Sequence, residues 1–113
     1  MYDGKQYDSY SFRDADTVTI STWERDYFDP DFTSFVSSET VSLEKAVERW
    51  VRLAKLPSDG GYDLYIQYFE YRKRFGEEGA ARFRALVSAA GGEIDASITD
   101  LRTFLHRRNR SET

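Results

Sequence analysis

The sequence contains no cysteine, only one histidine and only two prolines. Without cysteine, disulfide bonds, thiolate catalysis and cysteine-ligated zinc or iron–sulfur sites are excluded. A catalytic histidine needs a nucleophile and a group that orients it, and there is no Gly-x-Ser-x-Gly motif. His106 stands beside Arg107 and Arg108 near the end of the last expected helix, where a cation complements the helix dipole. We interpret His106 as structural.

Phosphate-binding loops and long apolar runs are also missing. Neither the P-loop pattern nor the dinucleotide-binding fingerprint fits the glycine pairs of this sequence, which are Gly60 and Gly61, Gly76 and Gly79, and Gly91 and Gly92. These glycines are typical of helix ends. No apolar run reaches the roughly 18 residues that a membrane-spanning helix needs. The polar N-terminus lacks the apolar core of a signal peptide. We expect a cytoplasmic protein, the cytoplasm of a host cell included, with no membrane partner.

Three aspartates in one loop, Asp26, Asp29 and Asp31, are the best candidate ligands for a hard cation. The EF-hand spacing, with its central glycine and closing glutamate, is absent, and aspartates of this kind commonly form turns. The sequence therefore predicts no metal site and no cofactor.

The composition is that of an ordinary globular domain. The 113 residues are 40% hydrophobic and 32% charged, which predicts a single domain over 1–113. Aromatic residues reach 16%, mostly eight tyrosines and eight phenylalanines. Tyrosine has an apolar body and a polar tip, which suits half-buried surfaces and interfaces.

The clearest periodic pattern lies in residues 42–56. Apolar residues recur at helical spacing, and charged residues fill the opposite face: the apolar ones are Leu43, Ala46, Val47, Trp50, Val51 and Ala54. Ser42 is a suitable N-cap, and Pro57 ends the segment. We predict a core helix here, with Trp50 at its centre.

The N-terminal third alternates as strands do. Residues 6–13 and 17–24 flank a turn at 14–16 and predict a β-hairpin with Tyr10, Phe12, Val18 and Ile20 facing inward. A third strand is expected over 32–37. Because a hairpin alone is marginal in water, this sheet is expected to pack on the helices.

The remainder predicts helices. Residues 62–75 fit helical spacing and strand alternation alike, and their length favours a helix. Further helices are expected over 77–90 and over 97–108, the latter capped by Ser97, with a frayed tail at 109–113. The predicted fold is α+β, a three-stranded antiparallel sheet (β region 6–38) packed on about four helices (helical region 42–108).

Charge is unevenly distributed along the chain. Residues 1–40 carry nine acidic and three basic residues, a net charge of −6, whereas the rest carries +2. An acidic surface with aromatic anchors can occupy a basic cleft that otherwise holds nucleic-acid phosphates. The predicted partner-binding residues are Asp14, Asp16, Trp23, Glu24, Asp26, Tyr27, Phe28, Asp29 and Asp31.

We therefore expect a non-enzymatic, protein-binding domain. It would inhibit a nucleic-acid-handling complex by docking on its basic surface, as phage anti-defence proteins of the anti-CRISPR type do, or would neutralise a toxin. The expected partner is another protein with a basic surface. A homodimer is a further alternative that the sequence does not exclude.

A basic surface supplies the alternative, a helical nucleic-acid-binding regulator. Its candidate residues are Arg72, Lys73, Arg74, Arg82, Arg84, Arg107 and Arg108. The pI near 5.0 and the interleaved acidic residues argue against direct nucleic-acid binding. A carboxylate-dependent enzyme is the second alternative, although no spacing selects a pair of acids.

Overall fold

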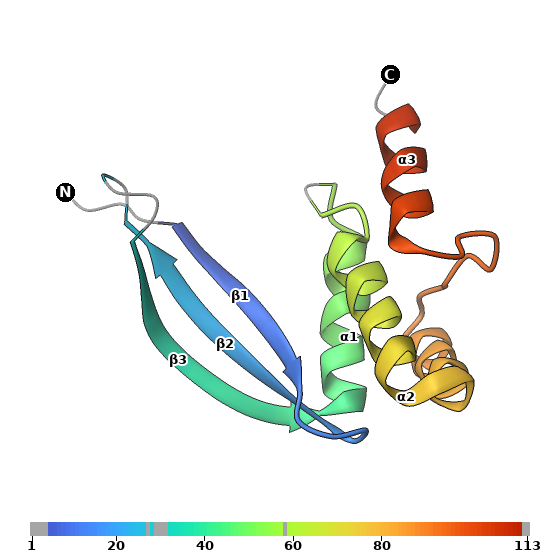
Figure 1. Cartoon of the computed structure of the whole chain (residues 1–113), viewed down its shortest axis with the longest axis horizontal. Coiled ribbons are helices and arrows are strands. Elements are labelled where there is room, and N and C mark those ends of the chain that lie inside the picture. Colours follow the sequence, from blue (N-terminus) through green and yellow to red (C-terminus); the bar gives the residue numbers. More distant parts are fainter. Residues whose placement is uncertain (1–4, 27, 29–31, 58, 112–113) are drawn as a thin grey trace. The chain divides into compact units, whose positions relative to one another are not determined.

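The computed structural model describes residues 5–26, 28, 32–57 and 59–111 (Figure 1). Within them, three strands precede three helices, so the predicted α+β class is confirmed. The strands are β1 (Lys5–Phe12), β2 (Thr17–Arg25) and β3 (Thr33–Ser42). The helices are α1 (Leu43–Ala54), α2 (Tyr62–Ala89) and α3 (Leu101–Ser111).

The chain divides into two compact units, which we call the sheet unit (Met1–Leu43) and the helical unit (Glu44–Thr113). Among the residues that the structure describes, no helix combines the length and apolar character needed to cross a membrane.

The sheet unit is an antiparallel sheet with strand order β1-β2-β3. Phe12 pairs with Val18 and Tyr10 pairs with Ile20, which places these four residues on one face, as the alternation predicts. Phe12, Val18 and Ile20 are buried and Tyr10 is half-buried.

Strand β3 is longer than the predicted 32–37. It runs to Ser42, and its pairing with β2 continues until Ser42 lies opposite Thr17. Nine of its ten residues are exposed, so no apolar alternation marks its second half. Serine and threonine there are held by pairing with β2, which the sequence pattern does not reveal. Ser42 thus ends a strand and leads directly into α1.

In the helical unit, the predicted stripe of α1 is confirmed. Ala46, Val47, Trp50 and Val51 are buried, and Trp50 has no exposed surface. The Trp50 ring stacks on Phe83 of α2, with ring centroids 5.9 Å apart. Trp50 therefore anchors the core of this unit, as its place in the stripe predicts.

The prediction of about four helices is wrong. Residues 62–75 are helical as expected, but α2 continues through Gly76 to Ala89, which leaves three helices. Gly76 has φ 75 and ψ −165 and kinks the helix. These angles lie in a region that is essentially restricted to glycine.

Replacing Gly76 with asparagine is expected to lower the free energy of unfolding by about 1–3 kcal/mol. No heavy atom lies within 4 Å of a Cβ built at Gly76, so the loss would come from backbone strain alone. Gly91→Asn is the matched control, since Gly91 at φ 84 follows α2 in a Schellman motif, where asparagine is tolerated. Urea denaturation measures both variants, and equal losses would contradict the strain assigned to Gly76.

Helix α3 begins later than predicted. It starts at Leu101, and the carboxylate of Asp100 accepts a hydrogen bond from the Thr103 backbone N–H at 2.7 Å, which caps it. The Asp100 pKa is lowered mainly by this bond. Ser97, the predicted cap, instead bonds the Asp95 carboxylate in a turn. The helix also extends to Ser111, beyond the predicted start of the tail at 109.

A second, smaller apolar cluster joins α2 to α3. Tyr65, Ile98 and Phe104 are its buried members, and the Tyr65 and Phe104 rings stack with centroids 4.5 Å apart. The Tyr65 hydroxyl accepts a hydrogen bond from the Asp95 backbone N–H at 2.9 Å. Burial raises the Tyr65 pKa, so the hydroxyl stays protonated at neutral pH.

Candidate functional site

Two of the predicted partner-binding acids lie in the turn between β1 and β2. Asp14 Oδ1 accepts hydrogen bonds from the backbone N–H groups of Asp16 and Thr17, at 2.8 and 2.9 Å. The bond from Asp16, followed by that from the Thr17 hydroxyl, lowers the Asp14 pKa. The Asp14 carboxylate therefore forms the turn, in the way that aspartate commonly does.

The other predicted residues that the structure describes lie at the opposite end of β2: Trp23, Glu24, Asp26 and Phe28. Asp26 Oδ1 accepts the Phe28 backbone N–H at 2.8 Å, and the Asp26 N–H donates to the Phe32 carbonyl at 3.0 Å. Tyr27, Asp29 and Asp31 lie outside the described residues. A nine-residue strand is roughly 26 Å long, so the described acids at its two ends, Asp14 and Asp16 against Glu24 and Asp26, do not form one surface.

Three aromatic side chains gather on one face of the sheet, near the loop between β2 and β3. We call Tyr7, Trp23 and Phe35 the aromatic patch. Tyr7 pairs with Trp23, and the Trp23 and Phe35 rings meet edge to face with centroids 5.6 Å apart. Phe35 is 57% exposed and Tyr7 is 40% exposed. In the sheet unit, the patch offers apolar surface to solvent beside a polar stretch of the same face.

Two polar contacts hold the patch in place. The Trp23 indole N–H donates to Ser9 Oγ at 3.0 Å, across the β1–β2 pair. The Arg25 guanidinium lies 5.7 Å from the Tyr7 ring centroid, within the range of a cation–π contact. Because these contacts come from neighbouring strands, the indole and the phenol are oriented before any partner arrives.

An irregularity in the strands brings Phe35 to Trp23. Thr22 pairs with Ser37, yet Trp23 pairs with Phe35, so Val36 is an extra residue in β3. With regular pairing, Val36 would stand opposite Trp23. Trp23 was predicted as a site residue from the sequence, whereas Phe35 was missed because no sequence signal indicates this bulge.

The acidic residues near the patch lie on the other face. Glu24 follows Trp23 in β2 and so faces away from it, on the side of Asp8 and Thr22. The Thr22 hydroxyl donates to Asp8 Oδ1 at 2.8 Å across this face. This end of the sheet therefore has one aromatic face and one acidic face.

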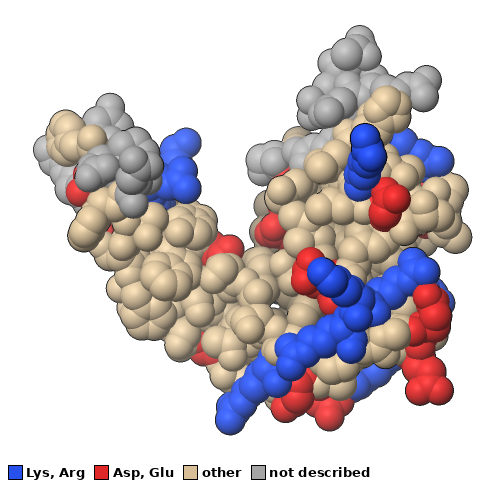
Figure 2. Space-filling model, in the orientation of Figure 1, with Lys and Arg blue, Asp and Glu red and all other residues tan. Residues whose placement is uncertain are grey.

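The predicted basic residues lie in the helical unit, where basic and acidic side chains are interleaved (Figure 2). Arg72 forms an ion pair with Glu77, at 2.8 Å, across the kink in α2. Arg107 lies 3.3 Å from the Asp95 carboxylate. The remaining predicted positions are exposed on α2 at Lys73, Arg74, Arg82 and Arg84, while the side chain of Arg108 is outside the described part of the structure.

Arg72 and Arg84 are brought together at a cavity of about 230 Å³, which we call the arginine hollow. The two halves of α2 and the loop before α3 supply its lining: Tyr68, Arg72, Glu77, Arg84, Ile94, Asp95, Ala96, Ile98 and Thr99. The Arg84 guanidinium donates to Tyr68 Oη at 2.7 Å. The sequence pattern predicted the two arginines but not the contribution of the loop.

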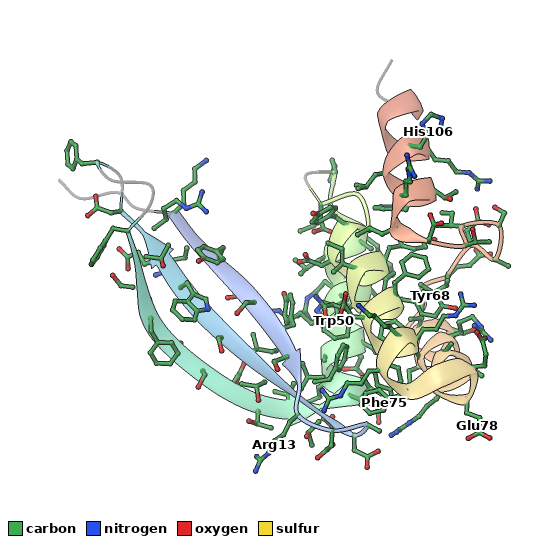
Figure 3. The ribbon with its side chains drawn as sticks, in the orientation of Figure 1. Arg13, Trp50, Tyr68, Phe75, Glu78 and His106 are labelled. Atoms are coloured by element: carbon green, nitrogen blue, oxygen red, sulfur yellow. The ribbon has the colours of Figure 1, made fainter. Side chains whose placement is uncertain are left out.

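His106 extends from α3 and is exposed (Figure 3). Within the described ranges, no group of three or more histidine or acidic side chains is placed to hold a metal ion. Asp95 has a lowered pKa, chiefly because the Ser97 hydroxyl and N–H bond its carboxylate. The structure thus presents two candidate sites, the aromatic patch and the arginine hollow. Comparisons with models of protein families, with curated proteins and with solved structures find no match to this chain.

Proposed function

We propose that this protein is a protein-binding domain whose partner docks on the aromatic patch. The observation that carries the proposal is the gathering of Tyr7, Trp23 and Phe35 on one face, with Phe35 57% exposed. Proteins that stay monomeric rarely leave such groups exposed together without a use for them. Tryptophan and tyrosine are also the side chains most enriched among residues that dominate interface energies.

The surroundings of the patch favour a protein partner. The same face continues along the strands as hydroxyl side chains, among them Ser9, Ser21, Thr19 and Thr40. Thr19 and Thr40 lie opposite one another, with their hydroxyl oxygens 3.4 Å apart. Apolar anchors beside adaptable hydrogen-bonding groups are typical of surfaces that recognise other proteins.

Charge favours a basic partner. Glu24 and Asp26 lie at the same end of the sheet as the patch, and residues 1–40 carry a net charge of −6. These carboxylates lie on the face opposite the patch, so they do not contact its partner directly, but their charge attracts a cationic surface over a distance of about 10 Å and accelerates association. A protein with a basic surface that binds nucleic acid fits this chemistry, and occupation of that surface would inhibit the protein. A basic toxin would fit as well, and binding would neutralise it.

Affinity capture tests the proposal. The tagged protein is incubated with lysate of its own host, with and without nuclease, and retained proteins are identified by mass spectrometry. One stoichiometric protein that survives nuclease is the expected result. Recovery that depends on nucleic acid would instead favour the basic helical surface, and recovery of the bait alone would contradict the proposal.

Phe35→Thr then locates the interface. It keeps a β-branched side chain on an exposed strand and removes the ring, so we expect affinity for the captured partner to fall about thirtyfold, or roughly 2 kcal/mol. Ser37→Ala, exposed on the opposite face of the same strand, is the matched control with an expected change below about threefold. Similar affinities for both variants would place the interface elsewhere.

A further inference from the structure

We propose that the arginine hollow binds a small carboxylate with a branched apolar body. The proposal is independent of the function assigned to the aromatic patch, because every residue that lines the hollow belongs to the helical unit.

The hollow is built from segments far apart in sequence. Tyr68 and Arg72 precede the kink at Gly76, and Arg84 follows it. The loop from Ile94 to Thr99 forms the opposite wall, and Tyr68 extends toward it from α2 (Figure 3). Ligand sites are commonly cavities lined by apolar side chains with a few polar groups, and this cavity has a guanidinium and a phenol beside apolar side chains.

Most charges around the hollow have partners in the protein. Glu77 Oε1 accepts a hydrogen bond from Arg72 Nε at 2.9 Å and forms an ion pair with Arg72 Nη2 at 2.8 Å. Asp95 Oδ1 accepts the Ser97 hydroxyl at 2.6 Å, and Oδ2 lies 3.3 Å from Arg107. These two carboxylates are therefore neutralised by neighbouring arginines.

Arg84 differs from the other charged groups. Among the described residues, its guanidinium hydrogen-bonds to the Tyr68 hydroxyl and has no carboxylate partner. The bond from Nη1 to Tyr68 Oη, at 2.7 Å, fixes the guanidinium at the cavity and leaves its other N–H groups available. The hollow thus presents one uncompensated positive charge.

A single uncompensated cation matches a monoanion. A guanidinium binds carboxylates and phosphates alike through two parallel hydrogen bonds, so the charge decides between them. One cation neutralises a carboxylate but does not neutralise a phosphate dianion. Ile94, Ala96 and Ile98 supply an apolar wall for the body of the ligand. The volume of about 230 Å³ limits that body to a small group.

The test is an NMR titration of the ¹⁵N-labelled full chain with isovalerate. Acetate lacks the apolar body, isovaleramide lacks the charge, and inorganic phosphate is the competing anion. We expect isovalerate to shift the amides of residues 68–72, 84 and 94–99 saturably. Acetate should bind more weakly, and isovaleramide and phosphate should leave these amides unchanged. Phosphate binding at least as tight as isovalerate, or shifts with isovaleramide equal to those with isovalerate, would overturn the assignment.

Two variants at exposed positions of α2 sharpen the test. Arg84→Gln removes the charge and should weaken isovalerate binding about tenfold or more. Arg82→Gln removes a charge two residues away that does not line the hollow, and should leave the affinity within about twofold. Equal affinities of the Arg84→Gln and Arg82→Gln proteins, or no saturable shift in the wild-type protein, would refute the site.

Discussion

Replacing Trp50 with alanine is expected to lower the free energy of unfolding by about 3–5 kcal/mol. Trp50 has no exposed surface, and its ring stacks on Phe83 with an angle of 13° between the planes. Phe83 in turn contacts the rings of Tyr68 and Tyr71, with centroids 5.4 and 5.7 Å away. Removal of the indole leaves a cavity at the centre of this aromatic cluster, and helices cannot collapse into it without losing the other contacts.

The loss is large relative to the total stability of a domain, which is commonly about 5–15 kcal/mol. Urea unfolding followed by far-UV circular dichroism measures it as a shift of the midpoint. Trp50→Phe retains part of the ring and should lose less. Arg52→Ala, exposed on the same helix, should change stability by no more than about 0.5 kcal/mol. If Trp50→Ala and Arg52→Ala unfold at the same midpoint, Trp50 is not the anchor of this core.

Helix α1 could be predicted from the sequence because local and tertiary requirements agree there. The residues that favour a helix also place every large apolar side chain on one face, and that face is the buried one. The β1–β2 hairpin was predictable for the same reason, since its alternation sorts Phe12, Val18 and Ile20 onto one face.

Prediction failed where long-range contacts decide the structure. The second half of β3 has almost no buried side chain, and pairing with β2 alone holds it as a strand. Gly76 resembled a helix end, yet its positive φ permits a kink through which α2 continues. The start of α3 was misjudged because Ser97 and Asp100 are both good caps, and the sequence does not say that Asp95 engages Ser97.

In the candidate sites, too, the residue types could be predicted from the sequence, whereas their arrangement depends on long-range contacts. Composition identified acidic and aromatic residues near the N-terminus, but residues 14–16 and 23–26 lie at opposite ends of β2. The bulge that aligns Phe35 with Trp23 arises from the pairing of β2 with β3, and neither strand's sequence indicates it. The arginine hollow needs the loop before α3, whose position depends on the contact of Tyr65 with Asp95.

Replacing Phe104 with alanine is expected to release α3 while the rest of the helical unit stays folded. Phe104 is buried and stacks on Tyr65, and Ile98 completes the small cluster. Loss of the ring should cost about 3–5 kcal/mol, because Phe104 is the buried side chain through which α3 stacks on Tyr65 of α2. An eleven-residue helix is marginal in water on its own, so α3 should fray once the contact is lost.

Native-state hydrogen exchange measures this outcome residue by residue. Protection at residues 101–111 should fall about a hundredfold or more in Phe104→Ala, while protection in α1 stays within about threefold. His106→Ala, exposed on the same helix, is the control and should leave protection in α1 and in α3 unchanged. An equal fall in α1 and α3 would show that the unit unfolds as one.

The same variant should also weaken isovalerate binding. The loop over residues 94–99 forms one wall of the arginine hollow and leads into α3, so release of α3 should loosen that wall. Phe104 itself contacts no charged group in the hollow, so this loss of affinity would come from the loop alone.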